Sequence, residues 1–153
     1  MNVFLIEIRK LALIRLFILI LAIKLIIAIG FNFLSQKLYN QPINKGKHNF
    51  ESLTEEFIIV VLVAPIVETI LFQFLPFKMI PKVRYKKYLY IVVSAIFFAF
   101  FHQYSMLYAL NAFVSGILFS YSYWLSSENK PFLFVTALHL SYNLFAFLLN
   151  NYF

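Results

Sequence analysis

Five long apolar stretches separated by short polar segments make up most of the chain. They cover residues 11–34, 57–75, 88–101, 106–125 and 132–149. A helix needs about 20 apolar residues to cross about 30 Å of hydrocarbon, and all the stretches except the shorter third one are close to this length. The pattern predicts an all-α fold, a polytopic transmembrane bundle of about five helices, with residues 1–153 forming a single integral-membrane domain.

Composition and charge support the same interpretation. The chain is 63% hydrophobic and 12% charged, whereas soluble domains carry about a quarter charged residues. It has no cysteine, which excludes disulfides and cysteine metal sites. The net charge of +7 is concentrated beside the apolar stretches, above all in the loop 76–87. That placement is typical of topology-setting loops next to a lipid bilayer and argues against nucleic acid as a partner.

The distribution of basic residues also predicts an orientation. With a cytoplasmic N-terminus, nine basic residues lie inside and three outside. The inside set is Arg9, Lys10, Arg15, Lys78, Lys82, Arg84, Lys86, Lys87 and Lys130, and the outside set is Lys37, Lys45 and Lys47. The positive-inside rule therefore favours a cytoplasmic N-terminus. The long first stretch contains Lys24 and lacks a small-residue cleavage site, so a removable signal peptide is not expected.

Two local patterns concern helix packing. Ala112, Gly116 and Ser120 repeat at a spacing of four, a small-residue stripe that lets two membrane helices approach closely. Pro65 lies inside the second stretch, three residues before Glu68, and should loosen the helix there.

Ionisable side chains inside the apolar stretches are the strongest indication of function. Glu68, His102 and His139 lie in or at the end of three different stretches, and Asn143 follows His139 by four residues, on the same helix face. Such groups are costly at bilayer depth and usually mark a functional site. If the three helices pack together, Glu68 and the two imidazoles could bind zinc or another divalent ion. Alternatively, Glu68 acts as a general base on water, with Asn143 donating to an oxyanion.

A purely structural interpretation stays open for each residue. A membrane histidine often joins two helices by a hydrogen bond, and Glu68 could pair with Lys24. Depth is a further constraint. Glu68 and His139 lie about 10 Å from the cytoplasmic ends of their stretches, and His102 about 20 Å. Bringing them together requires a tilted helix, an interfacial start to the third helix, or a bend.

The motifs resemble those of the CPBP family (CAAX protease and bacteriocin-processing, or Abi, family) of intramembrane proteases, which includes type II CAAX prenyl endopeptidases. The family motifs are Glu-Glu-x-x-x-Arg, Phe-x-x-x-His and His-x-x-x-Asn or Asp. The second is intact from Phe98 to His102 and the third from His139 to Asn143. The first is altered, because Thr69 and Gln73 replace the second Glu and the Arg. The resemblance covers residues 57–150, which we interpret as the catalytic core.

The resemblance implies a role for each matched position. Glu68 would activate water, and His102, His139 and Asn143 would complete the catalytic set. Glu68, His102 and His139 would be the metal ligands if zinc or another divalent metal is used, and a metal-free mechanism stays open. Phe98, Thr69 and Gln73 would support the site, the last two as a neutral hydrogen-bonded pair in place of the family's ion pair.

The residues, together with the resemblance to the CPBP family, imply two possible functions. The first is an intramembrane metalloendopeptidase in a bacterial plasma membrane, cleaving a peptide or protein substrate at the membrane, such as a prenylated CAAX protein or a bacteriocin precursor. The alternative is a non-catalytic membrane protein of the same fold that binds a peptide toxin and confers immunity. The four catalytic-type residues favour the first, and the altered first motif favours the second.

Overall fold

The computed structural model describes residues 3–43, 50–81 and 83–152, with side chains from Ala12 onward. Lys45, Lys47 and Lys82, which contribute to the charge count, lie outside the described residues. The described chain contains helices and no strands. The all-α prediction is therefore confirmed.

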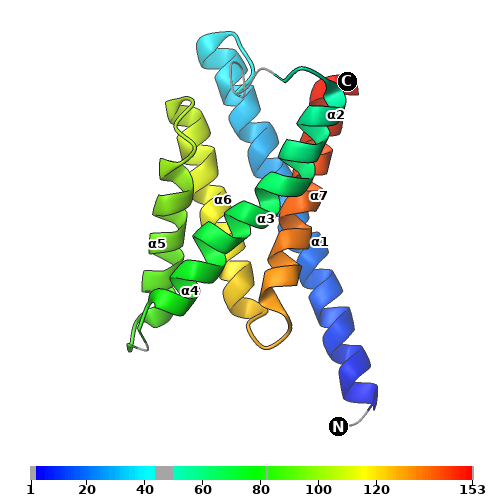
Figure 1. Ribbon diagram of the computed structural model, residues 1–153, viewed down its shortest axis with the longest axis vertical. Helices are drawn as coiled ribbons and strands as arrows, with labels where there is room; N and C mark the ends of the chain where they lie inside the picture. The colour runs from blue at the N-terminus through cyan, green and yellow to red at the C-terminus, as the bar shows by residue number, and fades with distance from the viewer. Residues whose placement is uncertain (1–2, 44–49, 82, 153) are drawn as a thin grey trace.

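Five helical rods correspond one to one with the five apolar stretches (Figure 1). The first is α1 (Val3–Tyr39), and the last three are α5 (Lys86–Phe100), α6 (Met106–Leu125) and α7 (Pro131–Tyr152). The second rod is continuous but changes helix type along its length. It consists of α2 (Leu53–Glu56), the π-helical η1 (Phe57–Val63), α3 (Ala64–Glu68), the π-helical η2 (Thr69–Phe74) and α4 (Leu75–Met79).

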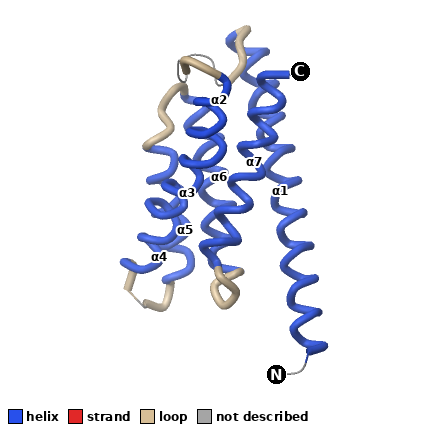
Figure 2. The backbone as a smooth tube through the Cα atoms, turned by 45° about the vertical axis from the view of Figure 1, so that its right-hand side comes forward, coloured by secondary structure: helices blue, strands red, loops and turns tan. Residues whose placement is uncertain are grey.

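The rods form an elongated bundle in which α1 begins and α7 ends at opposite ends (Figures 1 and 2). The α2–α4 rod crosses the bundle diagonally in Figure 1. It contacts α5, α6 and α7 through η2, and α7 also through η1 and α3. This tilt brings the middle of the α2–α4 rod to the C-terminal end of α5.

Three of the rods are long and apolar enough to cross a membrane, namely Ala12–Tyr39, Leu53–Met79 and Pro131–Tyr152. The shorter α5 packs against α6. Large apolar side chains cover the outside of the bundle, among them Ile14, Ile26, Val67, Phe97 and Leu133. A surface of this kind is stable only against lipid, so the chain is an integral membrane protein.

The second rod accepts side-chain hydrogen bonds from neighbouring helices at two of its backbone carbonyls. The Ala64 N–H bonds to Ile59 O in the π-helical register, so the next residue, Pro65, would bond to Val60 O if it had an N–H. That carbonyl instead accepts a hydrogen bond from Asn143 Nδ2 of α7 at 2.8 Å. Further along the rod, Phe72 O in the π-helical η2 accepts a hydrogen bond from Ser94 Oγ of α5. Side chains of neighbouring helices thus donate to two carbonyls of this rod, one of which Pro65 leaves without a backbone donor.

The small-residue stripe on α6 is the seam with α5, as predicted. Ala112, Gly116 and Ser120 are all buried. A methyl group placed on Gly116 would lie 2.7 Å from Ala95 Cα and 3.1 Å from Phe98 Cβ. The close approach of α6 to α5 therefore depends on the absence of a side chain at Gly116.

Replacing Gly116 with Ala should destabilise the protein by about 1–3 kcal/mol, because the backbone of α5 would have to move away. Gly30→Ala is the matched control, since a methyl group there meets nothing within 4 Å. Unfolding of both variants in detergent, followed by circular dichroism, measures the difference. Equal stability of the two variants would contradict the close seam.

Candidate functional site

Glu68 lies in the middle of the second rod, as the last residue of α3 between the two π-helical segments. Its Oε2 atom is 3.7 Å from His102 Nε2 and 3.5 Å from His139 Nε2. Both separations exceed a direct hydrogen bond but are within ion-pair range. The structure therefore brings together the carboxylate of the second rod, the imidazole of His102 in the loop just after α5, and the imidazole of His139 on α7.

His102 is held in place by the residues around the end of α5. Its Nδ1 lies 2.6 Å from Phe98 O, and because a carbonyl oxygen only accepts, Nδ1 carries a proton and donates it. The ring stacks between Phe98, at 4.4 Å between centroids, and Tyr108, at 6.0 Å. Phe98 of the Phe-x-x-x-His motif thus fixes both the orientation and the tautomer of His102, so that Nε2 points toward Glu68.

His139 is the most deeply buried of the three, with 4% of its side chain exposed. It projects from α7, and Phe119 of α6 lies against its ring with 4.5 Å between the centroids. The Phe98 ring is 5.8 Å away, so the same side chain contacts both histidines. Aromatic rings therefore pack against both imidazoles.

Asn143 and Glu68 line one cavity, but the Asn143 amide already has a hydrogen-bond partner. One N–H of Nδ2 donates to Val60 O, which ties α7 to η1. An asparagine amide has a second N–H, so the residue can hold the helix and still offer a donor to the cavity. The structure shows the fastening role, and the oxyanion role stays a prediction.

Thr69 and Gln73 do not form the expected neutral pair. The Thr69 hydroxyl donates to Pro65 O at 2.7 Å, and the fully buried Gln73 amide has no hydrogen-bond partner among the described residues. The reason is local geometry. η2 begins at Thr69 and is π-helical, so residues four apart no longer lie directly above one another as they would in an α-helix.

The suggested pairing of Glu68 with Lys24 is also wrong. The Lys24 ammonium lies 3.3 Å from Asn111 Oδ1 and 3.8 Å from the centre of the Tyr142 ring. The cavity is also lined by four residues that were not predicted as site residues from the sequence: Lys24, Tyr108, Asn111 and Phe119. A lone lysine within an apolar stretch was a usable signal, because such residues are functional candidates by default.

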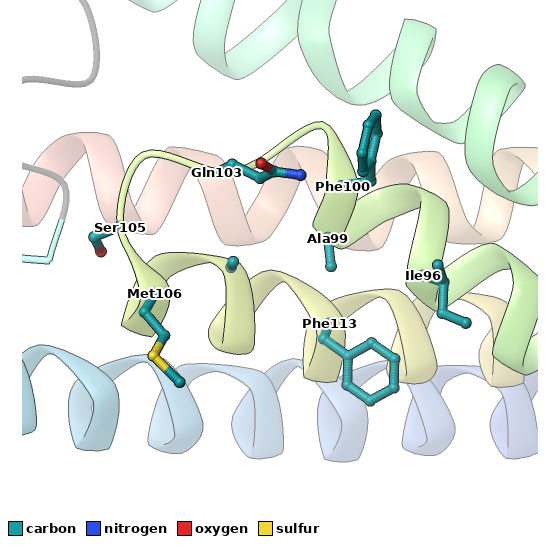
Figure 3. Close-up of a pocket in the computed structure, with 8 residues that line it drawn as sticks. Ile96, Ala99, Phe100, Gln103, Ser105, Met106 and Phe113 are labelled. Atoms are coloured by element: carbon teal, nitrogen blue, oxygen red, sulfur yellow. The ribbon is translucent and has the colours of Figure 1, made fainter.

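One cavity of about 820 Å³ lies between the rods, and every rod contributes to its lining, whereas Thr69 and Gln73 are not among the lining residues. It contains Glu68, His102, His139 and Asn143 together with Lys24. A second hollow of about 520 Å³ lies between the end of α5 and the start of α6 (Figure 3). Its lining is mainly apolar, with Ile96, Phe100, Met106 and Phe113, and holds none of the predicted site residues. The predicted catalytic residues therefore lie in the larger cavity.

The carboxylate oxygen and the two imidazole nitrogens at the site are atoms that commonly bind zinc in proteins. Two ligand atoms on one tetrahedral zinc lie about 3.4 Å apart, close to the separations between Glu68 Oε2 and each imidazole Nε2. Within the described residues, however, no group of three or more histidine, cysteine or acidic side chains is arranged to hold an ion. A metal at this site stays a prediction.

Fold and site together define a membrane-embedded helical protein in which one carboxylate and two imidazoles meet in a cavity between the helices. A family model described as "Type II CAAX prenyl endopeptidase Rce1-like" matches residues 51–145. The match covers more than half of the chain, so the chain belongs to the Rce1-like family, and the resemblance inferred from the motifs is confirmed. No curated protein and no solved structure matches it.

Replacing Asn143 with Ala should cost about 1–3 kcal/mol of stability, because Val60 O would be left without a donor in an apolar environment. Adding Pro65→Ala should recover part of this loss by restoring a backbone N–H to the rod. Unfolding in detergent of the two single variants and the double variant measures the recovery. Asn150→Ala, at an exposed position on the same helix, is the control. Strictly additive losses would refute the link between Pro65 and Asn143.

Proposed function

We propose that the protein is an intramembrane endopeptidase that hydrolyses a peptide bond with a water molecule activated by Glu68. The observation that carries the proposal is the position of one carboxylate oxygen within 3.7 Å of both imidazoles. Membership of a family of CAAX endopeptidases supports peptide hydrolysis as the reaction class. The cavity lies at membrane depth and suits a peptide or protein substrate that reaches the membrane, prenylated proteins included.

The side chains suggest the order of proton transfers. His102 keeps its proton on Nδ1, so its Nε2 lone pair can accept a hydrogen bond from water and orient it beside Glu68. Glu68 takes one proton as the water oxygen attacks the carbonyl carbon of the substrate. The carbon–nitrogen bond then breaks, and Glu68 returns the proton to the leaving nitrogen. The products are a carboxylic acid and an amine, so the atoms of one water molecule are accounted for.

Attack of water on the carbonyl carbon gives a tetrahedral intermediate with a negatively charged oxygen. Hydrogen-bond donors in the cavity are needed to stabilise this oxyanion. His139 lies within ion-pair range of Glu68, and Asn143 has a second amide N–H. Both line the cavity, so we assign them to oxyanion stabilisation. If zinc or another divalent ion is bound, Glu68, His102 and His139 would hold it, and it would polarise the water and the carbonyl group.

The orientation forms part of the proposal. The excess of basic residues in the segments on one side supports a cytoplasmic N-terminus and an external C-terminus. The opposite positions of the start of α1 and the end of α7 agree with an odd number of crossings.

A non-catalytic immunity protein is the second candidate. Its support is the altered first motif, in which Thr69 and Gln73 replace the family's charged pair and the Gln73 amide is buried without a partner among the described residues. Protection of cells against a peptide toxin that survives loss of Glu68, His102 and His139 together would favour this function. Loss of protection with the same triple variant would favour hydrolysis.

Glu68→Gln should lower peptide cleavage by about 100- to 10,000-fold, the usual contribution of a general base, and His102→Ala and His139→Ala should also reduce it strongly. The measurement is cleavage of a fluorogenic peptide by the protein purified in detergent. Glu128→Gln is the matched control, because Glu128 is exposed in the turn before α7. Full activity in Glu68→Gln would exclude the general-base role.

Metal dependence can be tested on the same preparations. A histidine-ligated ion predicts about one divalent ion per chain in the wild type and less in both histidine variants, with cleavage abolished by a chelator and restored by zinc. A mechanism that uses glutamate alone predicts cleavage that is insensitive to chelation. Measuring the metal content by plasma mass spectrometry distinguishes the metal-dependent from the metal-free mechanism. An ion retained in a variant that lacks both histidines would exclude them as ligands.

A further inference from the structure

Lys24 is a buried basic residue that the proposed hydrolysis does not use. It lies near the middle of α1, and 1% of the residue is exposed. Its ammonium contacts Asn111 Oδ1 of α6 at 3.3 Å and the face of the Tyr142 ring of α7 at 3.8 Å. Both partners are neutral. Within the described part of the chain, no carboxylate lies in ion-pair contact with this ammonium.

Lys24 lines the cavity that contains Glu68 and the histidines. On α7, Tyr142 follows His139 by three residues, which is about 4.5 Å along the helix axis. On α6, Asn111 follows Tyr108 by three residues, and the Tyr108 ring stacks on His102. The two contacts of Lys24 thus lie one helical turn from residues that form or support the imidazole site.

A desolvated cation with only neutral partners is incompletely compensated, and an anion entering the cavity would compensate it. A lipid phosphate group is a poor source of that anion. Lys24 is 12 residues from the start and 15 residues from the end of the apolar span Ala12–Tyr39, about 18 and 22 Å along the helix. Headgroups at the membrane surface do not reach that depth, whereas a peptide bound in the cavity that Lys24 and Glu68 both line would.

We propose that Lys24 binds the free C-terminal carboxylate of the peptide substrate. The proposal rests on the proposed hydrolysis at Glu68 and adds the feature by which the substrate is selected. A CAAX motif occupies the last four residues of a protein. A bond cleaved within it has at most three residues between it and the free carboxylate, and these span at most about 11 Å when extended. The charge of Lys24 would therefore select substrates that end shortly after the cleaved bond.

The test uses two forms of one probe, an S-farnesylated fluorogenic peptide ending in cysteine, two aliphatic residues and methionine. One form has a free C-terminal carboxylate and the other a C-terminal amide. The wild type should show a kcat/KM at least about tenfold higher for the acid, mainly through KM, because the amide leaves the buried charge unpaired. Lys24→Met should bring the acid-to-amide ratio close to one, and Lys24→Arg should retain part of the preference.

Lys37→Met is the matched control, because Lys37 is an exposed lysine near the end of the same helix. It should keep the wild-type ratio. Equal kcat/KM for acid and amide in the wild type, or an unchanged ratio in Lys24→Met, would overturn the proposal. The wild-type comparison needs no variant, so it decides the question even if Lys24→Met fails to fold.

Binding separates this proposal from the proposed hydrolysis. Fluorescence anisotropy with the same two peptides and Glu68→Gln protein measures affinity without turnover. Tighter binding of the acid, lost in the Glu68→Gln/Lys24→Met double variant, supports the carboxylate site even if the wild type cleaves neither peptide. Cleavage of both peptides at equal rates, with equal binding, would support the hydrolase and reject the role of Lys24.

Discussion

Two side-chain hydrogen bonds to backbone carbonyls of the second rod, one of them to the carbonyl that Pro65 leaves without a donor, determine how the site is assembled. Inside a bilayer no water is present to satisfy a free carbonyl, so each carbonyl needs a donor from the protein. Asn143 of α7 and Ser94 of α5 provide these donors to the rod that carries Glu68. The same bonds therefore satisfy the backbone and fasten the rod that carries Glu68 to α7, which carries His139, and to α5, which His102 follows.

Aromatic side chains hold the two imidazole rings in their orientations. The Phe98 carbonyl accepts a hydrogen bond from His102 Nδ1–H, and the Phe98 ring stacks on the His102 ring and also contacts the His139 ring. Because Phe98 packs against Gly116 at the α5–α6 seam, the seam and the site are mechanically connected. The small stripe on α6 is thus part of the support of the imidazoles. The buried Gln73 amide, by contrast, contributes no hydrogen bond within the described residues.

Much of this arrangement was predictable from the chain. The apolar stretches correspond to the helices because runs of this length must satisfy their backbone internally in lipid. Glu68, His102 and His139 were identifiable since ionisable residues at membrane depth are rare and costly. The Thr69–Gln73 pair was predicted wrongly, because an i,i+4 argument assumes an α-helix and Thr69 begins a π-helical segment. Neither the tilt of the rod nor the partner of Lys24 follows from spacing along one helix.

The sequence by itself determined the class of protein, the number of helical rods and the residue types available for chemistry. It did so because hydrophobic length and the cost of buried charge are local properties of the chain. Only the tertiary structure decided that one oxygen of Glu68 meets both imidazoles, that Asn143 bonds to Val60 O, and that Lys24 turns to Asn111 instead of Glu68. These contacts join residues far apart in the chain, and their geometry depends on helix tilt and on the π-helical turns, which no single helix specifies.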